Sequence, residues 1–311
     1  MAVKEKCIIW GMGNDYEILL NQIKFEIYKE NIEVVGVVRC KEDKYCEYRD
    51  GFPVVLKEEL LKIDFEYVII ISSLFYKEIR AEAVGLGIGS DKIVNGQVLR
   101  KPLFDFGLYS KLIKNPVTII TDDCWGGFVY NYLSLVFSSP LINTFWAKSD
   151  YSEFIQDPLF YLHTELTMVR EGDLKVGVWP IGRLGKAGKY VQIQFMHNVS
   201  FDEALQQWNR RKERINQDNL FVKMGVSIAD TNYKFYLESF DKCRYKKILF
   251  YNGDENIKSK FSTDRFIWQE HKAKRVGRYL YSDYMRDNYM FVIDILKLLT
   301  GEEDYSRECF Y

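Results

Sequence analysis

The first hundred residues alternate between short apolar runs and segments whose apolar side chains recur at helical spacing. Strands are predicted for the apolar runs at 7–10, 32–38, 67–72 and 93–94. Helices are predicted for the intervening segments at 16–30, 56–62 and 76–84. The apolar runs are continuous, which is typical of parallel strands buried on both faces of a sheet. The pattern therefore predicts an α/β domain over residues 1–101.

This rhythm breaks between residues 102 and 115, where proline and glycine interrupt any clean period, and we expect a linker there. A second alternation follows. Its predicted strands are 117–120, 141–145, 174–178, 190–196, 220–224 and 247–251, and its main predicted helices are 200–216 and 282–299. Gly301 would cap the closing helix. We expect an α/β protein of two Rossmann-like domains with mostly parallel sheets, at 1–101 and 116–311.

Composition narrows the class of protein. The 311 residues contain 43 Lys and Arg against 44 Asp and Glu, so a strongly basic nucleic-acid-binding protein is excluded and no nucleic-acid partner is expected. There is no export signal, no apolar run near the roughly 20 residues of a membrane helix, and no cysteine pair spaced for zinc. The six scattered cysteines indicate reduced thiols in a cytoplasmic protein with no metal site.

One segment departs from this neutral balance. Residues 241–280 contain 11 Lys and Arg against 5 Asp and Glu, a net charge of +6. Such a segment could attract nucleotide-sugar phosphates or an anionic membrane surface, which would allow peripheral membrane association. The alternative is a solvated basic face without a ligand.

Gly11, Gly13 and Asn14 follow the first predicted strand, where glycines let the backbone approach a phosphate at a helix N-terminus. The dinucleotide fingerprint is incomplete, because Tyr16 stands where the third glycine belongs. This disfavours bound NAD, and no cofactor can be assigned. The two interpretations left open are a nucleotide-sugar site and a tight turn without a ligand.

A second polar cluster follows the first strand of the second half. It comprises Asp122, Asp123, Cys124, Gly126 and Gly127. Ligands of open α/β sheets bind beyond the carboxyl ends of strands, so this position favours a site. One carboxylate could act as a general base, the two together could hold a divalent metal, and the glycines would admit a ligand. Alternatively, an aspartate only caps the next helix while Cys124 packs inward.

Two further residues are candidates for the same site. His197 ends the predicted strand 190–196 and is one of only three histidines, so it is a natural general acid or base. The alternative is a histidine that bonds a loop. Arg211 lies at the edge of the apolar stripe of helix 200–216, where its guanidinium could hold an anion or belong to a solvated face. Ser200 and Glu203 form the capping box that starts this helix.

Ordered motifs between residues 116 and 255 resemble a bacterial family of unknown function whose members are commonly labelled exopolysaccharide biosynthesis proteins. The motifs are Cys124-Trp125-Gly126-Gly127, Phe137 to Asn143, Pro180-Ile181-Gly182, Gln194 to His197, Trp208 to Arg211 and Asn219 to Phe221. The first hundred residues resemble, more loosely, the nucleotide-sugar-binding N-terminal domain of sugar O-acyltransferases. That resemblance extends sugar-nucleotide binding to Gly11, Gly13 and Asn14, but not the acyl-transfer chemistry, since no hexapeptide repeat follows.

These observations predict a cytoplasmic protein of cell-surface polysaccharide synthesis that binds a nucleotide-sugar or glycan intermediate. It would transfer a glycosyl or other group, with Asp122, Asp123 and His197 at the polar centre. The rival expectation is a non-catalytic binding or scaffold protein of the same pathway. The sequence leaves the oligomeric state open.

Overall fold

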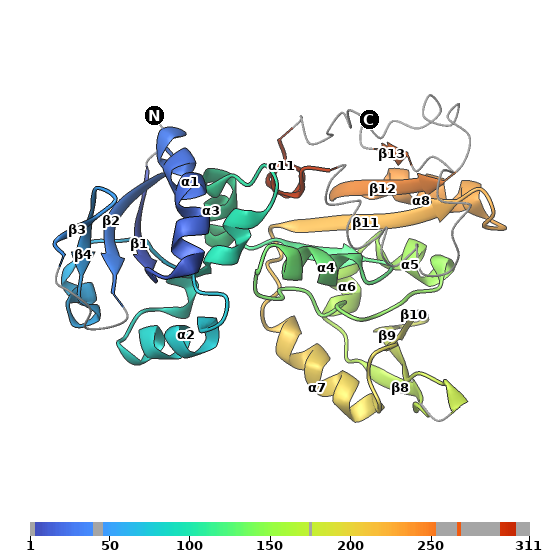
Figure 1. The fold of residues 1–311 in the computed structure, drawn as a ribbon. Helices are drawn as coiled ribbons and strands as arrows, with labels where there is room; N and C mark the ends of the chain where they lie inside the picture. Colours follow the sequence, from blue (N-terminus) through green and yellow to red (C-terminus); the bar gives the residue numbers. More distant parts are fainter. Residues whose placement is uncertain (1–3, 40–45, 174–175, 253–265, 269–292, 303–311) are drawn as a thin grey trace. The chain divides into compact units, whose positions relative to one another are not determined.

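The structure is a computed structural model, and it describes residues 4–39, 46–173, 176–252, 266–268 and 293–302. The chain divides into two compact units. The first comprises residues 1–114, 132–134 and 294–306, and the second comprises 115–131, 135–293 and 307–311. Both are mixed α/β units whose main sheet is largely parallel (Figure 1).

The first unit contains a six-stranded sheet in the order β3-β4-β2-β1-β5-β6. Its strands are β1 (Glu5–Trp10), β2 (Ile32–Val38), β3 (Tyr48–Arg49), β4 (Phe52–Val55), β5 (Tyr67–Ile70) and β6 (Ile93–Asn95). Its α-helices are α1 (Asn14–Tyr28), α2 (Tyr76–Gly85), α3 (Phe106–Lys114) and α11 (Ile295–Thr300), and its 3-10 helices are η1 (Lys57–Lys62), η2 (Ser90–Lys92) and η3 (Gly96–Arg100). All strand pairs are parallel except β3 with β4.

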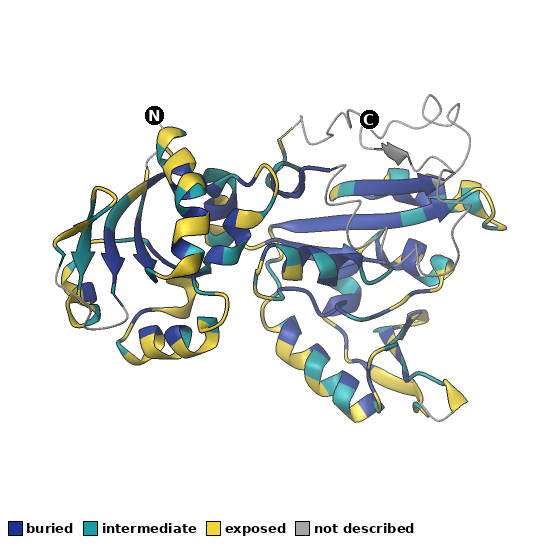
Figure 2. Ribbon diagram, in the orientation of Figure 1, coloured by how far each residue is buried: buried dark blue, intermediate teal, exposed yellow. Residues whose placement is uncertain are grey.

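Both faces of the central strands β1 and β5 are buried, as the continuous apolar runs predicted (Figure 2). Ile8 and Trp10 of β1 share a core cluster with Ile79 of α2. Because side chains alternate along a strand, Cys7 and Ile9 point to the opposite face, and both are fully buried. The strand order reverses at β1, between β2 and β5, which is where open parallel sheets place ligands.

The second unit contains two sheets. The main one has the order β13-β12-β11-β7 and only parallel pairs. Its strands are β7 (Thr118–Thr121), β11 (Leu220–Ser227), β12 (Lys246–Asn252) and β13 (Phe266–Trp268). A smaller antiparallel sheet joins β8 (Thr167–Arg170), β9 (Ile181–Lys186) and β10 (Lys189–Gln194). The helices are α4 (Trp125–Tyr132), α5 (Lys148–Phe154), α6 (Pro158–Leu162), α7 (Phe201–Lys212) and α8 (Tyr233–Lys242).

Helices and the small sheet cover the main sheet of the second unit. Val222 and Met224 of β11 pack in a large aromatic-rich cluster with Tyr151 of α5 and Trp208 of α7. On the other face, the Trp125 ring of α4 lies 6.5 Å from that of Phe221. Side chains alternate between the two faces along a strand, so Lys223, which follows Val222, points toward the face covered by α4.

Several sequence expectations need correction. The predicted strand 141–145 is a turn with one isolated bridge at Phe145, because Asn143 adopts a left-handed conformation (φ 65°) that ends extended structure. Segment 190–196 was expected in the parallel sheet, but β10 pairs antiparallel with β9 through a tight turn. Ala187 and Gly188 both have positive φ there (54° and 83°), as hairpin turns of this length prefer.

Three other expectations concern boundaries. The stretch 102–115, expected as a linker, contains α3, which packs within the first unit. Of the predicted strand 174–178, residues 174–175 lie outside the described residues, and Val178 forms an isolated bridge with Asp173 rather than a strand. Of the predicted helix 282–299, residues 282–292 lie outside the described residues. The left-handed cap at Gly301 is confirmed by its φ of 86°, and the Glu302 N–H donates to the Lys297 carbonyl.

Candidate functional site

The junction between β7 and α4 gathers most of the predicted site residues. β7 ends at Thr121, and Asp122, Asp123 and Cys124 precede the first turn of α4. The Asp123 carboxylate accepts hydrogen bonds from the Trp125 N–H and the Thr121 hydroxyl, each at 3.0 Å. Asp123 therefore does cap the helix, the structural alternative raised by the sequence.

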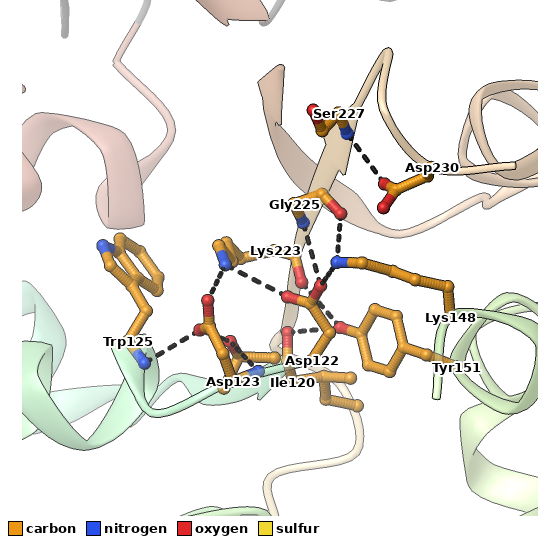
Figure 3. A network of polar contacts seen from close by, with 11 residues as sticks. Ile120, Asp122, Asp123, Trp125, Lys148, Tyr151, Lys223, Gly225, Ser227 and Asp230 are labelled. Atoms are coloured by element: carbon orange, nitrogen blue, oxygen red, sulfur yellow. Dashed lines mark hydrogen bonds and ion pairs between the residues drawn. The ribbon is translucent and has the colours of Figure 1, made fainter. Parts of the chain in front are cut away.

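Asp122 is the centre of a buried ionic cluster (Figure 3). Its Oδ1 lies 3.0 Å from the Lys223 Nζ, and its Oδ2 accepts from the Lys148 Nζ at 2.5 Å and the Gly225 N–H at 3.1 Å. Lys223 also pairs with Asp123, so two ammonium groups face two carboxylates and the charges balance. Asp122 is 2% exposed and Lys223 is 1% exposed, so solvent screens these contacts little.

The cluster holds Asp122 and Lys223 ionised. Burial by itself would raise the pKa of Asp122, but Lys223 and Lys148 outweigh it and lower this pKa to about 2. Burial would likewise lower the pKa of Lys223, but the two aspartates raise it above its usual value. An anion that is permanently paired with two cations is a poor general base. Asp122 is therefore held by two lysines, whereas Asp123 is held by one lysine and by the start of α4.

A thiol and an imidazole meet beside this cluster. The Cys124 Sγ lies 3.7 Å from the His197 Nε2, although the two residues are 73 positions apart. Cys124 is half-buried and His197 is exposed. Burial raises the pKa of the Cys124 thiol, Asp123 raises it further, and Lys223 opposes them. Burial and Asp123 thus favour the protonated thiol, and the imidazole lies beside it.

The two segments meet for a reason that the sequence reasoning did not foresee. The expectation was that both follow strands of one parallel sheet, but His197 follows β10 of the antiparallel sheet. Phe145 and Trp146 instead connect the end of β10 to the end of β7 through their backbone N–H groups. The Phe145 N–H donates to the Gln194 carbonyl at 2.9 Å, and the Trp146 N–H donates to the Asp122 carbonyl at 3.2 Å. The end of β10 is thereby tied to the end of β7.

Gly126 and Gly127 were expected to leave room for a ligand. The structure fills that space with protein, because a Cβ on Gly126 would lie 3.0 Å from the Thr121 side chain and one on Gly127 would lie 3.3 Å from that of Ile142. Their missing side chains let α4 pack closely on its neighbours. Any role toward a ligand falls to their backbone N–H groups.

Arg211 was expected at the edge of the apolar stripe of its helix, where it would hold an anion. It is instead 7% exposed, donates to the Ile142 carbonyl at 3.0 Å, and lies over the Phe137 ring at 5.6 Å. Burial, together with Arg210 and Arg214, lowers the pKa of this guanidinium. These contacts hold the segment 137–142 against α7, which is a structural role.

The corresponding junction of the first unit is built differently. Gly11 has a φ of 125°, which only glycine adopts readily, whereas Gly13 has a φ of −88°, and a Cβ added to it would meet no atom within 4 Å. Gly13 precedes Asn14, the first residue of α1. Asp15 then places a carboxylate in the first helical turn, where it accepts from the Ser73 N–H and hydroxyl and pairs with Arg100. A carboxylate there competes with a ligand phosphate for the helix N-terminus.

The sequence reasoning missed Lys148 and Lys223. Lys223 carried a usable signal, because it is a lone charge within the apolar strand Leu220–Ser227, and a buried lysine needs an acidic partner. Lys148, at the start of α5, had no such signal in the sequence. Among the residues that the structure describes, no group of three or more acidic, cysteine or histidine side chains is arranged to hold a metal ion. Within the same ranges, no helix has the length and apolarity needed to cross a membrane.

These features define a mixed α/β protein with a cysteine–histidine pair at a strand-to-helix junction. The chain belongs to the family described as a domain of unknown function, DUF1919, whose model matches residues 95–299. Residues 3–94 match a second model, described as C2185-like, N-terminal. A Haemophilus influenzae protein described as uncharacterized is 32% identical over 148 residues. That alignment covers 46% of this chain and 65% of the Haemophilus protein, so less than two thirds of the relative is spanned.

Proposed function

We propose that the chain is a group-transfer enzyme of cell-surface exopolysaccharide synthesis that acts on a nucleotide-sugar or glycan intermediate. The observation that carries the reaction part is the 3.7 Å contact between the Cys124 sulphur and the His197 Nε2. A nucleophile beside a base, at the carboxyl end of a parallel strand, is the arrangement that covalent catalysis requires. The pathway part rests on the resemblance of residues 116–255 to proteins with that label.

The proposal takes both parallel sheets as Rossmann-like domains. The first, with its open Gly13, would bind a nucleotide-sugar, and the second would carry the chemistry. It also places the reaction in the cytoplasm, because the four described cysteines Cys7, Cys46, Cys124 and Cys243 are free thiols, which persist in reducing compartments.

A non-catalytic binding or scaffold protein is the second candidate. The observation in its favour is that both aspartates expected as catalytic groups are occupied by lysines. Under this alternative the same surface would bind a glycan intermediate without turnover, and His197 would be dispensable for function.

Ligand protection of the thiol tests the binding claim. The protein is incubated with iodoacetamide in the presence of individual nucleotide-sugars and short glycans, and the alkylated cysteines are quantified by peptide mass spectrometry. A ligand at a hundred times its Kd leaves about one molecule in a hundred free, so alkylation of Cys124 should slow by roughly a hundredfold. Cys46, a half-buried thiol of the first unit, is the internal control and should keep its rate.

Turnover separates the two candidates. Any compound that protects Cys124 is incubated with the protein and followed for consumption. For an enzyme, His197→Ala should reduce turnover by about 10² to 10⁴ while protection persists. His163, which is also exposed and ends α6, provides the matched control His163→Ala. A panel in which no compound protects Cys124 would overturn the proposed substrate class.

A further inference from the structure

The neighbourhood of Cys124 restricts the kind of group that it could transfer. Transfer of a glycosyl group commonly uses two carboxylates, one as nucleophile and one as acid or base. Here Asp122 is bound by two ammonium groups and a backbone N–H, and Asp123 by Lys223, Thr121 and the helix N-terminus. Neither carboxylate has the freedom that this chemistry needs. The Cys124 thiol, by contrast, is a nucleophile in contact with an imidazole.

The first turn of α4 adds two hydrogen-bond donors beside the thiol. The Trp125 N–H is occupied by Asp123, and the first N–H bonded along the helix is that of Phe128, which donates to the Cys124 carbonyl. Between them, the N–H groups of Gly126 and Gly127 have no acceptor among the described residues. Both glycines are buried, and buried N–H groups without an acceptor are rare. Helical N–H groups point toward the N-terminus, the end that carries Cys124.

We infer that the second unit transfers an acyl group, carried as a thioester on Cys124, from an activated acyl ester or thioester to a sugar hydroxyl. Thiols attack carbonyl carbon readily, and backbone N–H groups at a helix N-terminus stabilise the negative oxygen that forms during the attack. Gly126 and Gly127 supply these donors. This inference rests on the proposed function for the acceptor, and on the geometry of Cys124 and His197 for the donor half of the reaction.

In the first half-reaction, the Cys124 sulphur forms a bond to the acyl carbonyl carbon while its proton passes to the His197 Nε2. The bond from that carbon to the donor's leaving group breaks, and the leaving group takes the proton from the imidazolium. In the second half, His197 removes the proton of a sugar hydroxyl, whose oxygen attacks the thioester. The carbon–sulphur bond breaks and the thiol regains the proton, so no oxidant or further reactant is required.

The thioester can be trapped directly. The full chain is incubated with p-nitrophenyl acetate, and the acylated positions are identified by intact-mass and peptide mass spectrometry. We expect one added acetyl group, located on Cys124 and released by hydroxylamine at neutral pH. His197→Ala should slow its formation by on the order of a hundredfold. His163→Ala and Cys46→Ser should have no effect, and circular dichroism verifies that each variant is folded.

The outcomes separate this inference from the proposed function. Acetylation of Cys46 at the same rate as Cys124, or an unchanged rate in His197→Ala, would overturn the acyl-transfer inference. A sugar ligand that protects Cys124 in a protein that forms no thioester would leave the proposed binding function standing and eliminate acyl transfer. Thioester formation without protection by any sugar compound would support the acyl-enzyme step and show that the proposed sugar acceptor is wrong.

Discussion

Each unit has a strand-to-helix junction at the carboxyl end of its first strand, and the two junctions carry different chemistry. β1–α1 has glycines at 11 and 13 and two acidic residues in the first helical turn, whereas β7–α4 has a balanced ionic cluster with a thiol and an imidazole beside it. The first junction offers open space without a reactive group. The second offers a thiol and an imidazole beside a buried ionic cluster. Position at the end of a parallel strand therefore indicates where a site can form, and the side chains decide what it does.

The ionic cluster distinguishes the second junction most strongly, and removing Lys223 tests it. Lys223→Met deletes a cation that is 1% exposed and leaves Asp122 with Lys148 alone, so we expect a loss of about 3–5 kcal/mol in the free energy of unfolding. Lys189→Met, at an exposed position of β10, is the control and should change it by less than about 0.5 kcal/mol. If urea denaturation gave the same change for Lys223→Met and Lys189→Met, the ionic cluster would add nothing to the stability of the protein.

The glycines of the first junction should differ sharply from each other. Gly11→Ala forces a side chain onto a φ of 125°, which should cost about 1–3 kcal/mol. Gly13→Ala has an ordinary φ of −88° and open space, so it should be neutral or stabilising by about 0.4–1 kcal/mol. Thermal unfolding of both variants is the measurement. A large loss of stability in Gly13→Ala would show that this junction is packed rather than open.

Acid should weaken the second junction through Asp122. Its pKa is lowered from 3.8 to about 2 by its lysine partners, so its contribution is complete above pH 3.8 and is lost as the pH falls through about 2. The amount is on the order of 2 kcal/mol. Urea unfolding at several pH values should therefore show a shallower acid slope for Asp122→Asn than for the wild type. Asp15→Asn, which removes a half-buried paired carboxylate from the first junction, is the comparison. A slope unaffected by Asp122→Asn would contradict the pairing.

The cap of α7 gives the smallest effect and concerns the segment that carries His197. The Ser200 hydroxyl accepts from the Glu203 N–H at 3.2 Å, and the Glu203 carboxylate accepts from the Val199 N–H at 2.9 Å. Ser200→Ala should cost about 1 kcal/mol, whereas Ser200→Gly should cost a few tenths. Calorimetry can resolve the pair, and indistinguishable values would show that the box does not fix the start of the helix.

Much of the fold was predictable because its signals are local. The buried strands are continuous apolar runs, and the capping box at Ser200 and the glycine cap at 301 lie where their residue types predict. The antiparallel sheet was missed although Tyr190 to Gln194 alternates apolar and polar residues, the pattern of a half-buried strand, and the turn at Ala187 and Gly188 sets its direction. Pairing partners distant in sequence leave little trace in a single chain.

The site was predictable in its members but less so in their roles. Asp122, Asp123, Cys124 and His197 do gather at one junction, yet the two aspartates are held by lysines that the sequence reasoning had not included. Lys148 lies 26 positions from Asp122, and Lys223 lies 101 positions from it. Whether a carboxylate is free or paired depends on such distant residues, so its reactivity could not be settled from its own neighbours.

The central claim is that Cys124 and His197 act as a coupled pair, and the pH dependence of Cys124 alkylation tests it most directly. The rate of reaction with iodoacetamide is measured from pH 5 to pH 10 by peptide mass spectrometry, for the wild type and for His197→Ala. In the wild type we expect two inflections, one at lower pH that depends on the imidazole and one above the usual thiol pKa of 9.0. His197→Ala should lose the lower inflection and keep the upper one. Identical profiles for the two proteins would contradict the account, because the imidazole would then have no influence on the thiol.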